Sequence, residues 1–367
     1  MAGSMSGRLP DPAFWRGKRV FVTGHTGFKG AWLALWLRRL GADVTGFALP
    51  PDLPSLAEAA GVEPRITSIR GDIRDLPALG RAVQAADPQI VLHLAAQALV
   101  RLSYQQPVET FATNVMGTAH VLEAARQAPQ VRALVSVTTD KCYENREWVW
   151  PYRETDRLGG HDPYSASKAC AELVTAAWRN SFLSADRPGK PALAVATARA
   201  GNVIGGGDWS LDRLVPDCVR AFAAGQVVPI RSPHATRPWQ HVLEPLCGYL
   251  LLAEQLWTSG QAFAEAWNFG PVLDDVQPVS RVVQLLAQAW GDGADWKIAD
   301  GPHPHEAGFL AVDPSLARRR LGWRPRLRLE PALEWTARWH RQYADGMDAA
   351  RLVEADIERY EGIGDGQ

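Results

Sequence analysis

The first part of the chain alternates short apolar runs with longer segments in which apolar residues recur at helical spacing. The runs are rich in β-branched residues and predict buried strands at 18–23, 43–48, 66–70, 89–94, 133–137 and 193–198. Residues 28–40 include Trp32, Leu33 and Trp36, and their apolar density predicts a mostly buried helix that Gly41 ends. Such strands, joined by helical crossovers, indicate a parallel sheet that is covered on both faces.

The pattern changes after Gly205. Glycine and proline become frequent, and Trp209 and Trp239 lie in loop-like surroundings, which indicates a smaller and more irregular lobe. An apolar run at 267–270 predicts one further strand, and residues 333–343 have the spacing of an amphipathic helix.

The first predicted strand leads directly into a glycine-rich turn. Gly24, Gly27 and Gly30 form a G-x-x-G-x-x-G pattern between this strand and the helix at 28–40. Glycines permit a tight turn and a close backbone approach, so a pyrophosphate can lie on the helix N-terminus. In this context the pattern predicts a dinucleotide-binding turn, and a tight turn that binds no ligand is the alternative.

Together these patterns predict an α/β fold, a Rossmann-type doubly wound parallel sheet with a smaller, mixed C-terminal substrate-binding lobe. The dinucleotide-binding domain is expected at 14–202, with a return at 241–270, and the substrate lobe at 203–240 and 271–360.

One expected feature of a dinucleotide site is missing. The second strand should end in an acidic residue that binds the adenosine ribose, but it runs into Ala48, Leu49 and Pro50. Ribose recognition is therefore unassigned. Asp72 and Ile73, which follow the third strand, are the candidates for holding the adenine.

A tyrosine and a lysine share one face of a predicted helix. Pro163 suits the first turn of this helix, which places Tyr164 and Lys168 at positions i and i+4. Tyrosine is a poor base at its ordinary pKa of about 10. A neighbouring ammonium favours the phenolate and lowers that pKa, so the pair could take a proton from a sugar hydroxyl. A surface helix pair is the alternative.

The strand at 133–137 ends in a polar run, Thr138, Thr139, Asp140 and Lys141. In an open parallel sheet the carboxyl ends of strands face the ligand crevice. Hydroxyl, carboxyl and amine groups placed there could exchange protons with a substrate, although a capped strand end would use the same residues.

Composition narrows the classes of function. The chain has 39 basic and 40 acidic residues, a balance that argues against nucleic-acid or membrane-surface partners. No stretch approaches the roughly 20 apolar residues of a membrane span. The four cysteines form no C-x-x-C pair and no metal-like cluster with histidine, so we expect no metal site. Reduced thiols of this kind indicate the cytoplasm.

Arginine is the chain's usual cation, because only six of the 39 basic residues are lysines. Three of these six, Lys29, Lys141 and Lys168, lie inside the three motifs described above. Lys168 has a physical reason, because a compact ammonium would lie beneath the tyrosine. Lys141 has one only if it loses its proton, which an arginine cannot do.

Several motifs in order carry a family resemblance. The glycine pattern, the Tyr164/Lys168 pair and the Ala95-Ala96 strand end ahead of Asn114 resemble the extended short-chain dehydrogenase/reductase superfamily. Within it, five segments are similar to the CDP-glucose 4,6-dehydratases: GHTGFKGAWLALWL (24–37), TTDKCYEN (138–145), AGNVIGGGDW (200–209), RPWQHVLEP (237–245) and HPHEA (303–307). The similarity runs from about residue 14 to beyond residue 340.

The resemblance implies a redox-neutral dehydration with NAD as cofactor. Tyr164 would take the proton of the C4 hydroxyl while NAD takes the C4 hydride, and Lys168 would support the tyrosine. Thr139 would orient the C4 oxygen, and Asp140 would protonate the departing C6 hydroxyl. Water leaves across C5 and C6, and the hydride returns to C6, which gives CDP-4-keto-6-deoxy-glucose.

Lys141 departs from the wider dehydratase group, whose members usually carry a glutamate there. It could remove the C5 proton directly, or through a water, only if it is neutral.

The resemblance also implies the residues that hold each ligand. The cofactor would contact Gly24, Thr26, Gly27, Phe28, Lys29, Gly30, Asp72, Ile73, Ala95, Ala96, Asn114, Tyr164 and Lys168. The substrate-side candidates are Asn202 and the arginines Arg231 and Arg237 for the diphosphate, with Glu306 for a ribose hydroxyl.

The expected partner is a nucleotide-sugar, CDP-glucose, used in deoxysugar biosynthesis such as that of lipopolysaccharide O-antigen. Members of the group commonly form homodimers through the helix that carries Tyr164 and the helix before it. Three alternatives stay open: a 4,6-dehydratase for another nucleotide-sugar, a nucleotide-sugar 4-epimerase, and a dinucleotide-sensing regulator without catalysis. An epimerase would need no acid–base pair at Asp140 and Lys141, and a regulator should lack the Tyr164/Lys168 pair.

Overall fold

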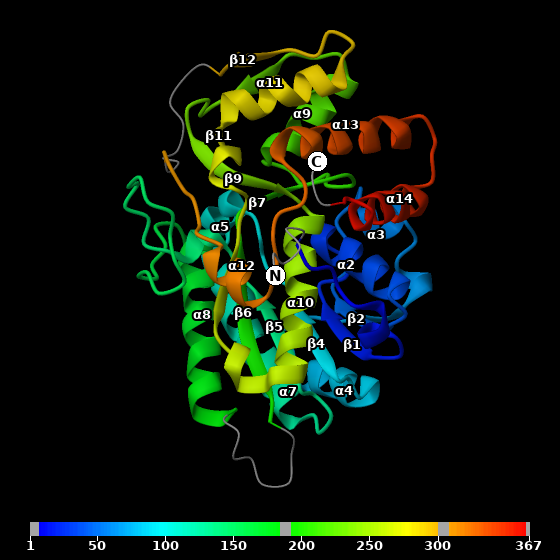
Figure 1. Ribbon diagram of the computed structural model, residues 1–367, viewed down its shortest axis with the longest axis vertical. Helices are drawn as coiled ribbons and strands as arrows, with labels where there is room; N and C mark the ends of the chain where they lie inside the picture. The colour runs from blue at the N-terminus through cyan, green and yellow to red at the C-terminus, as the bar shows by residue number, and fades with distance from the viewer. Residues whose placement is uncertain (1–6, 184–191, 300–307, 365–367) are drawn as a thin grey trace, which may run out of the picture.

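A seven-stranded parallel sheet forms the centre of the computed structural model, which describes residues 7–183, 192–299 and 308–364. Its strand order is β10-β6-β5-β4-β1-β2-β3 (Figure 1). The bounds are β1 Arg19–Thr23, β2 Asp43–Ala48, β3 Thr67–Arg70, β4 Ile90–His93, β5 Ala133–Val137, β6 Ala194–Ala200 and β10 Ala266–Phe269. The predicted α/β, doubly wound fold is confirmed.

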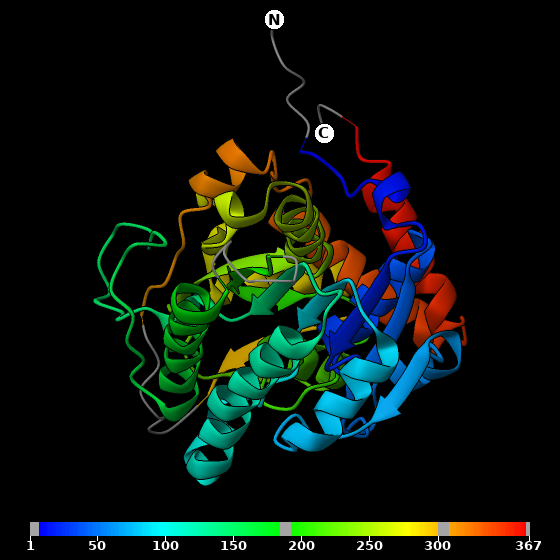
Figure 2. The ribbon, with the colours of Figure 1, turned by 90° about the horizontal axis from the view of Figure 1, so that it is seen from below.

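Helices cover both faces of this sheet (Figure 2). One face packs against α2 (Phe28–Arg39) and α10 (Leu243–Ser259), and the other against α4 (Leu76–Ala86), α7 (Gly117–Gln127) and α8 (Pro163–Phe182). Successive residues of a strand point to opposite faces. Accordingly Val20 and Val22 of β1 join the first core, whereas Phe21 joins the second.

The chain reverses its winding between β1 and β4, which are neighbours in the sheet although β2 and β3 separate them in sequence. In open α/β sheets the crevice at such a switch point, beyond the carboxyl ends of the strands, is where ligands bind. The segments that follow β1, β4 and β5 therefore define the candidate site.

A smaller mixed lobe lies beyond the carboxyl ends of these strands (Figure 1). It contains a three-stranded sheet, β11-β9-β7, in which β9 is parallel to β7 and antiparallel to β11, and a two-stranded sheet of β12 and β8. The bounds are β7 Asn202–Ile204, β8 Val228–Ile230, β9 Thr236–His241, β11 Val276–Pro278 and β12 Trp296–Ile298. Its helices are α9 Leu214–Ala223, α11 Val279–Trp290 and α13 Leu329–Ala344.

The remaining elements are short or terminal. The helices are α1 Pro12–Trp15, α3 Leu56–Ala59, α5 Val100–Gln105, α6 Pro107–Phe111, α12 Ser315–Arg320 and α14 Ala349–Glu361. The tighter or wider turns are η1 Glu63–Arg65, η2 Ala112–Met116, η3 Asp140–Cys142, η4 Gly260–Phe263 and η5 Leu273–Asp275, of which η2 is a π-helix.

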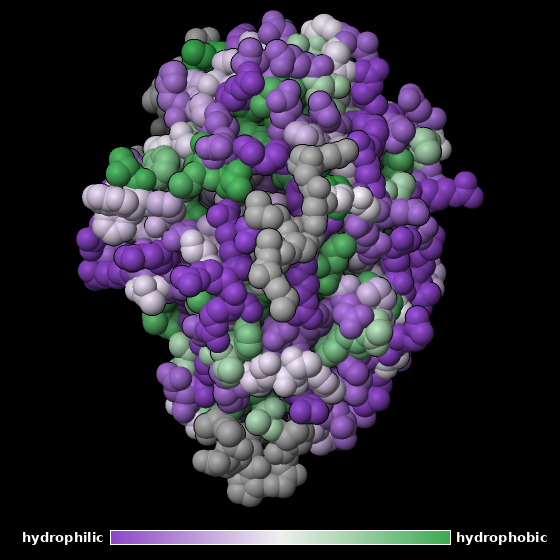
Figure 3. Space-filling model, viewed as in Figure 1, coloured by the Kyte–Doolittle hydropathy of each residue, from purple (hydrophilic) through white to green (hydrophobic). Residues whose placement is uncertain are grey.

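The surface is mainly polar on the face shown in Figure 3, where apolar residues lie in small separate groups. None of the helices in the described ranges is long and apolar enough to cross a bilayer. All four cysteines are free thiols, and three of them are buried.

Candidate active site

The glycine turn after β1 is built by close backbone contacts. Gly24 has φ +79°, and a Cβ there would lie 2.7 Å from the backbone nitrogen of Ala95. A Cβ on Gly30 would overlap the carbonyl oxygen of Gly24. Both positions therefore require glycine, and the turn brings the α2 N-terminus against the loop that follows β4.

The N-terminus of α2 suits an anion. Its N-cap, Gly27, provides no side-chain hydrogen bond, and the first turn contains no acidic residue. Thr26 lies before it, and its hydroxyl donates to the carbonyl oxygen of Leu49 over 3.0 Å. The first backbone N–H groups of a helix have no intrahelical acceptor, so this end can hold a pyrophosphate.

Lys29 points into the protein rather than to solvent. Its ammonium donates to the Tyr249 hydroxyl over 3.3 Å and lies 5.6 Å from the centre of that ring. Burial, with the positive charges of Arg213 and Lys168, lowers the pKa of Lys29 to about 7. Lys29 therefore faces the interior between α2 and α10, close to the charges of the site.

The adenine candidates lie after β3 at the other end of the crevice. Hydrogen bonds from Arg74 hold the Asp72 carboxylate and lower its pKa. Ile73 is buried, and its carbonyl oxygen accepts from His120 over 2.9 Å. After β2, where an acidic residue was expected, the Leu49 carbonyl oxygen accepts from both Thr26 and Arg70.

Asn114 connects the loop after β4 to the helix of the Tyr/Lys pair. It lies in the π-helical turn η2, a kind of irregularity that is frequent at functional sites. Its side-chain nitrogen donates to the Gln97 carbonyl oxygen and to the Ser167 hydroxyl, each over 2.9 Å. Ala95 and Ala96 precede Gln97, so Asn114 fixes this loop next to α8.

The polar strand end after β5 forms the tight turn η3. The Thr139 hydroxyl donates to Asp140 Oδ1 over 3.0 Å, and the backbone nitrogen of Lys141 donates to Thr139 Oγ1 over 3.3 Å. Asp140 is buried, and within the described chain its Oδ2 has no hydrogen-bond partner. Burial raises the pKa of Asp140, although the charges of Lys141 and Arg237 oppose this.

The helix α8 presents Tyr164 and Lys168 to this turn. Asp162 caps the helix by accepting from the backbone nitrogen of Ser165, and Pro163 is its first residue. The Tyr164 side chain hydrogen-bonds with Thr139, which brings the hydroxyl of the helix to the strand end. Asp140 is close enough to act on Tyr164 electrostatically.

The electrostatics of the pair differ from the expectation. Burial raises the pKa of Tyr164 to about 12, and the groups that oppose this are the Thr139 hydroxyl and Arg213. The Lys168 ammonium donates to the carbonyl oxygen of Val137 over 3.2 Å, and burial lowers its pKa to about 8. The pKa of Tyr164 is therefore raised in the protein alone and not lowered as expected, because desolvation outweighs the groups that favour the phenolate.

The substrate-side candidates fall into two groups. Asn202 begins β7, directly after Gly201, where an added Cβ would lie 3.0 Å from Asp140 Oδ2. Arg237 is buried on the neighbouring strand β9, and its charge acts on Asp140. Arg231 follows β8, in the separate two-stranded sheet, and Glu306 lies outside the described residues.

Two sets of residues were missed in the sequence. Arg213, the N-cap of α9, is close enough to act on both Tyr164 and Lys29, but nothing distinguishes it among so many arginines. Glu172 forms a buried ion pair with Arg199 beneath the strand end. Its place four residues after Lys168, on the same helical face, was a signal that could have revealed it.

A comparison with protein families decides the class of this chain. The model of the NAD dependent epimerase/dehydratase family matches residues 20–266, which contain the glycine turn, η3 and the Tyr164/Lys168 pair. The chain belongs to this family.

Relatives within the family share most of its length. It is 51% identical, over 95% of this chain and 98% of the other, to CDP-glucose 4,6-dehydratase of Salmonella typhimurium. Among solved structures, DesIV, a dTDP-glucose 4,6-dehydratase from Streptomyces venezuelae with NAD and TYD bound, aligns with a TM-score of 0.75 and 25% identity, over 90% of this chain and 99% of that one. A UDP-glucose-4-epimerase from Stenotrophomonas maltophila shares the fold, with a TM-score of 0.76 at 22% identity, over 89% and 99% of the two chains.

The family assignment fits the observed site. The glycine turn, the uncapped α2 N-terminus and the Tyr164–Thr139 contact lie together at the switch point of the sheet. No group of three or more metal-ligating side chains was found in the parts of the chain that the structure describes.

Proposed function

We propose that this protein dehydrates CDP-glucose to CDP-4-keto-6-deoxy-glucose in an NAD-dependent, redox-neutral reaction. The observation that carries the proposal is Asp140. Its buried carboxyl has a raised pKa and a side-chain oxygen with no hydrogen-bond partner in the described structure, next to the Thr139–Tyr164 contact. A raised pKa favours the protonated acid that the loss of a C6 hydroxyl needs.

The residues present fit NAD. The cradle formed by Gly24 and Gly30 would be blocked by any Cβ, and the α2 N-terminus can take the pyrophosphate. Asp72 and Ile73 lie at the adenine end, and Asn114 fixes the loop of Ala95 and Ala96. Bound NAD supplies an acceptor for the C4 hydride and later a donor to C6, and its oxidised ring is a cation that favours tyrosinate.

Thr139, Tyr164 and Lys168 together remove the proton from the sugar O4. Thr139 orients O4 by a hydrogen bond, and Tyr164 takes its proton. Lys168 lies one helical turn further on, and its ammonium form favours the phenolate of Tyr164, although burial lowers the pKa of Lys168 to about 8. Arg213 adds a second positive charge that acts on the same hydroxyl.

Asp140 and Lys141 complete the elimination. Once C4 is a ketone, the C5 proton becomes acidic. Lys141 removes it directly or through a water, and Asp140 gives its proton to the departing O6, which leaves as water. When the hydride returns to C6, Lys141 gives the proton back to C5, which completes the 6-deoxy product. Two adjacent residues of η3 thus serve as base and acid. Asn202, which follows Gly201 beside Asp140, and Arg237, whose charge acts on Asp140, bind the diphosphate.

The CDP preference is supported by the relative with 51% identity. We expect CDP-glucose to be converted with a much higher kcat/KM than dTDP-, GDP- or UDP-glucose when the four are tested side by side by mass spectrometry. Faster conversion of another nucleotide would move the proposal to a different 4,6-dehydratase. An unchanged product mass with a new sugar configuration would favour the 4-epimerase.

We also propose that the protein is a homodimer that pairs through α7 and α8. Large apolar side chains are exposed on α8 and on the segments that precede α7, namely Leu173, Phe182, Val108 and Met116. Exposed apolar side chains that lie on neighbouring helices are typical of a contact between subunits.

A further inference from the structure

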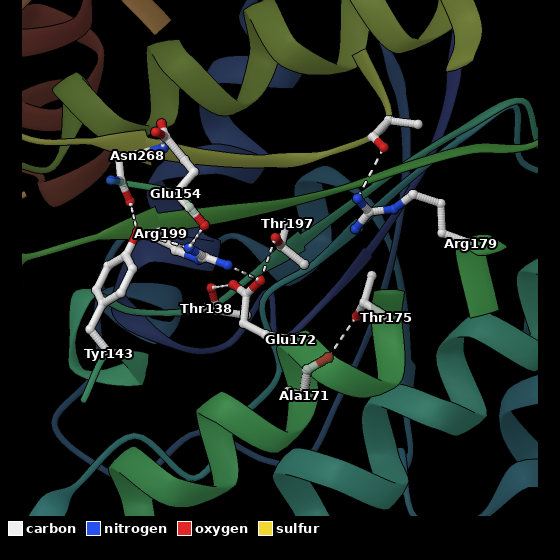
Figure 4. A network of polar contacts seen from close by, with 11 residues as sticks. Thr138, Tyr143, Glu154, Ala171, Glu172, Thr175, Arg179, Thr197, Arg199 and Asn268 are labelled. Atoms are coloured by element: carbon white, nitrogen blue, oxygen red, sulfur yellow. Dashed lines mark hydrogen bonds and ion pairs between the residues drawn. The ribbon is translucent and has the colours of Figure 1, made fainter. Parts of the chain in front are cut away.

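The turn that carries Thr139, Asp140 and Lys141 is held at both ends by one buried ion pair. Thr138 precedes the turn and Tyr143 follows it. The side chains of these two residues lead to Glu172 and Arg199 (Figure 4). Neither charged residue belongs to the residues assigned to the proposed reaction.

The carboxylate of Glu172, on α8, binds the residue that precedes the turn, Thr138. It accepts from the Thr138 hydroxyl over 2.5 Å and from the Thr197 hydroxyl over 2.7 Å. Arg199 Nη2, on β6, donates to it over 2.8 Å, and both charged side chains are only 3% exposed. Burial acts to raise the pKa of Glu172, but Arg199 and the two hydroxyls outweigh it, so the group is a carboxylate.

Arg199 binds the residue that follows the turn, Tyr143. Its Nη1 donates to the Tyr143 hydroxyl over 2.8 Å, and this hydroxyl in turn donates to Asn268 Oδ1 over 2.7 Å. The guanidinium also lies 4.9 Å from the centre of the Tyr143 ring. Thr138 and Tyr143 are therefore tied to opposite members of the same pair (Figure 4).

The position of Glu172 on α8 connects the ion pair to the Tyr164/Lys168 face of this helix. It lies one helical turn after Lys168 and two turns after Tyr164, on the same face of α8. A buried ion pair contributes little net stability, because desolvation offsets the attraction between the charges. What such a pair does provide is a fixed distance between the elements that it joins, here α8, β6 and the two ends of the turn.

We propose that Glu172 and Arg199 are positioning residues that set the register between the η3 turn and the Tyr164/Lys168 face of α8. The inference rests on the proposed function. The pair touches no reacting atom, and it acts by keeping Thr139 and Asp140 at their places beside Tyr164.

The test removes single hydroxyls and leaves the two charges paired. Thr138→Val and Tyr143→Phe each release one end of the turn. Thr197→Val is the control, because it removes a hydroxyl that donates to the same Glu172 carboxylate but belongs to a residue outside the turn. We expect the first two variants to lose about tenfold or more in kcat with CDP-glucose, because small displacements of reacting groups slow the chemical step. KM should stay within about twofold, and Thr138→Ser should restore kcat.

Thr197→Val should keep kcat within about twofold of the wild type, and the thermal midpoints of all variants, measured alongside, show whether they are folded. A structural role alone would make Thr138→Val and Thr197→Val equally active. That result, or wild-type kcat in both Thr138→Val and Tyr143→Phe, overturns the inference. A wild-type enzyme that converts none of the four nucleotide-glucoses would instead overturn the proposed function, before any variant is compared.

Discussion

At the scale of single residues, burial shifts the pKa values of the titratable groups in the site. Asp140 is shielded, and desolvation raises its pKa, whereas desolvation lowers the pKa of the equally buried Lys168 to about 8. Both shifts favour the neutral form of the group, because burial penalises charge. Burial thus moves the pKa of the acid and that of the amine in opposite directions.

Lys141 is the residue whose role most needs a test. Lys141→Ala should lower kcat by about 10²–10⁴-fold if the amine removes the C5 proton. Lys141→Arg should be almost as poor, because a guanidinium keeps its charge but cannot act as a base. Steady-state kinetics with CDP-glucose measure both effects. Lys297→Ala, at an exposed lysine of β12, is the matched control. Wild-type kcat in Lys141→Arg would contradict the base role.

Most residues of the candidate site could be found in the sequence, because motif and strand-end position mark them. Thr139, Asp140 and Tyr164 are brought together as expected. The pKa of Tyr164 could not be predicted, since it depends on how completely the fold excludes water. Arg213 could not be found either, because it reaches the site from the start of α9 through tertiary structure alone.

At the scale of elements, the glycine turn shows how tightly a local conformation is specified. Gly30→Ala should destabilise the protein by about 1–3 kcal/mol and weaken NAD binding at least tenfold, because its Cβ would overlap the Gly24 carbonyl oxygen. Gly80→Ala, in the middle of α4 with open space around it, should instead stabilise by about 0.5–1 kcal/mol. Thermal unfolding and calorimetric titration with NAD measure both. Equal behaviour of the two variants would contradict this account of the turn.

Another element, α10, anchors the C-terminal segment through the buried carboxyl of Glu244. This group accepts from the backbone nitrogens of Arg326 and Leu327 and from the Tyr360 hydroxyl. Burial nevertheless raises the pKa of Glu244 to about 7, from 4.5, against these donors and the charge of Arg326. The folded protein therefore binds a proton here that the unfolded chain has already lost between these two pH values.

The sign of the pH dependence follows. The contribution of Glu244 to stability is fully present below pH about 4.5 and is lost as the pH rises through about 7, by up to about 3 kcal/mol. Glu244→Gln keeps the hydrogen bonds without the charge, so its free energy of unfolding should decline less over this range. Denaturant titrations at several pH values test this, with the exposed Glu334→Gln as control. A decline as steep as that of the wild type would contradict the assignment.

Continuous apolar runs predicted the central elements well, because residues of β1, β4 and β5 are buried in both cores and α2 is buried over most of its length. The π-helical turn η2 at 112–116 had no marker in the sequence. It carries Asn114, whose hydrogen-bond partners lie far along the sequence, on a loop and on α8.

At the scale of the whole molecule, the two lobes meet over the carboxyl ends of the parallel strands. β6 runs into β7, so Asn202 of the smaller lobe follows directly on the central sheet, and β10 returns to that sheet beside β6. The sequence predicted β10 as a strand at 267–270. It could not predict that β10 pairs with β6, because the two strands are far apart in the sequence.

The proposed homodimer is tested at this scale. Leu173, on α8, is 59% exposed, and Leu173→Glu would place a charge in the apolar contact of each subunit. We expect this variant to weaken the dimer by about 2 kcal/mol or more and to elute as a monomer. Light scattering coupled to size-exclusion chromatography measures the mass. Leu273→Glu, at an equally exposed leucine of η5, should remain a dimer. A monomeric wild type would contradict the proposal.

The central claim is that the protein moves hydrogen within one sugar while water is lost. The most direct test is the conversion of CDP-glucose that carries deuterium at C4, followed by mass spectrometry and NMR of the product. We predict a product that has lost one water and carries the deuterium at C6, with no net change in NAD. Deuterium left at C4 in a product of unchanged mass, or lost to solvent, would contradict the account.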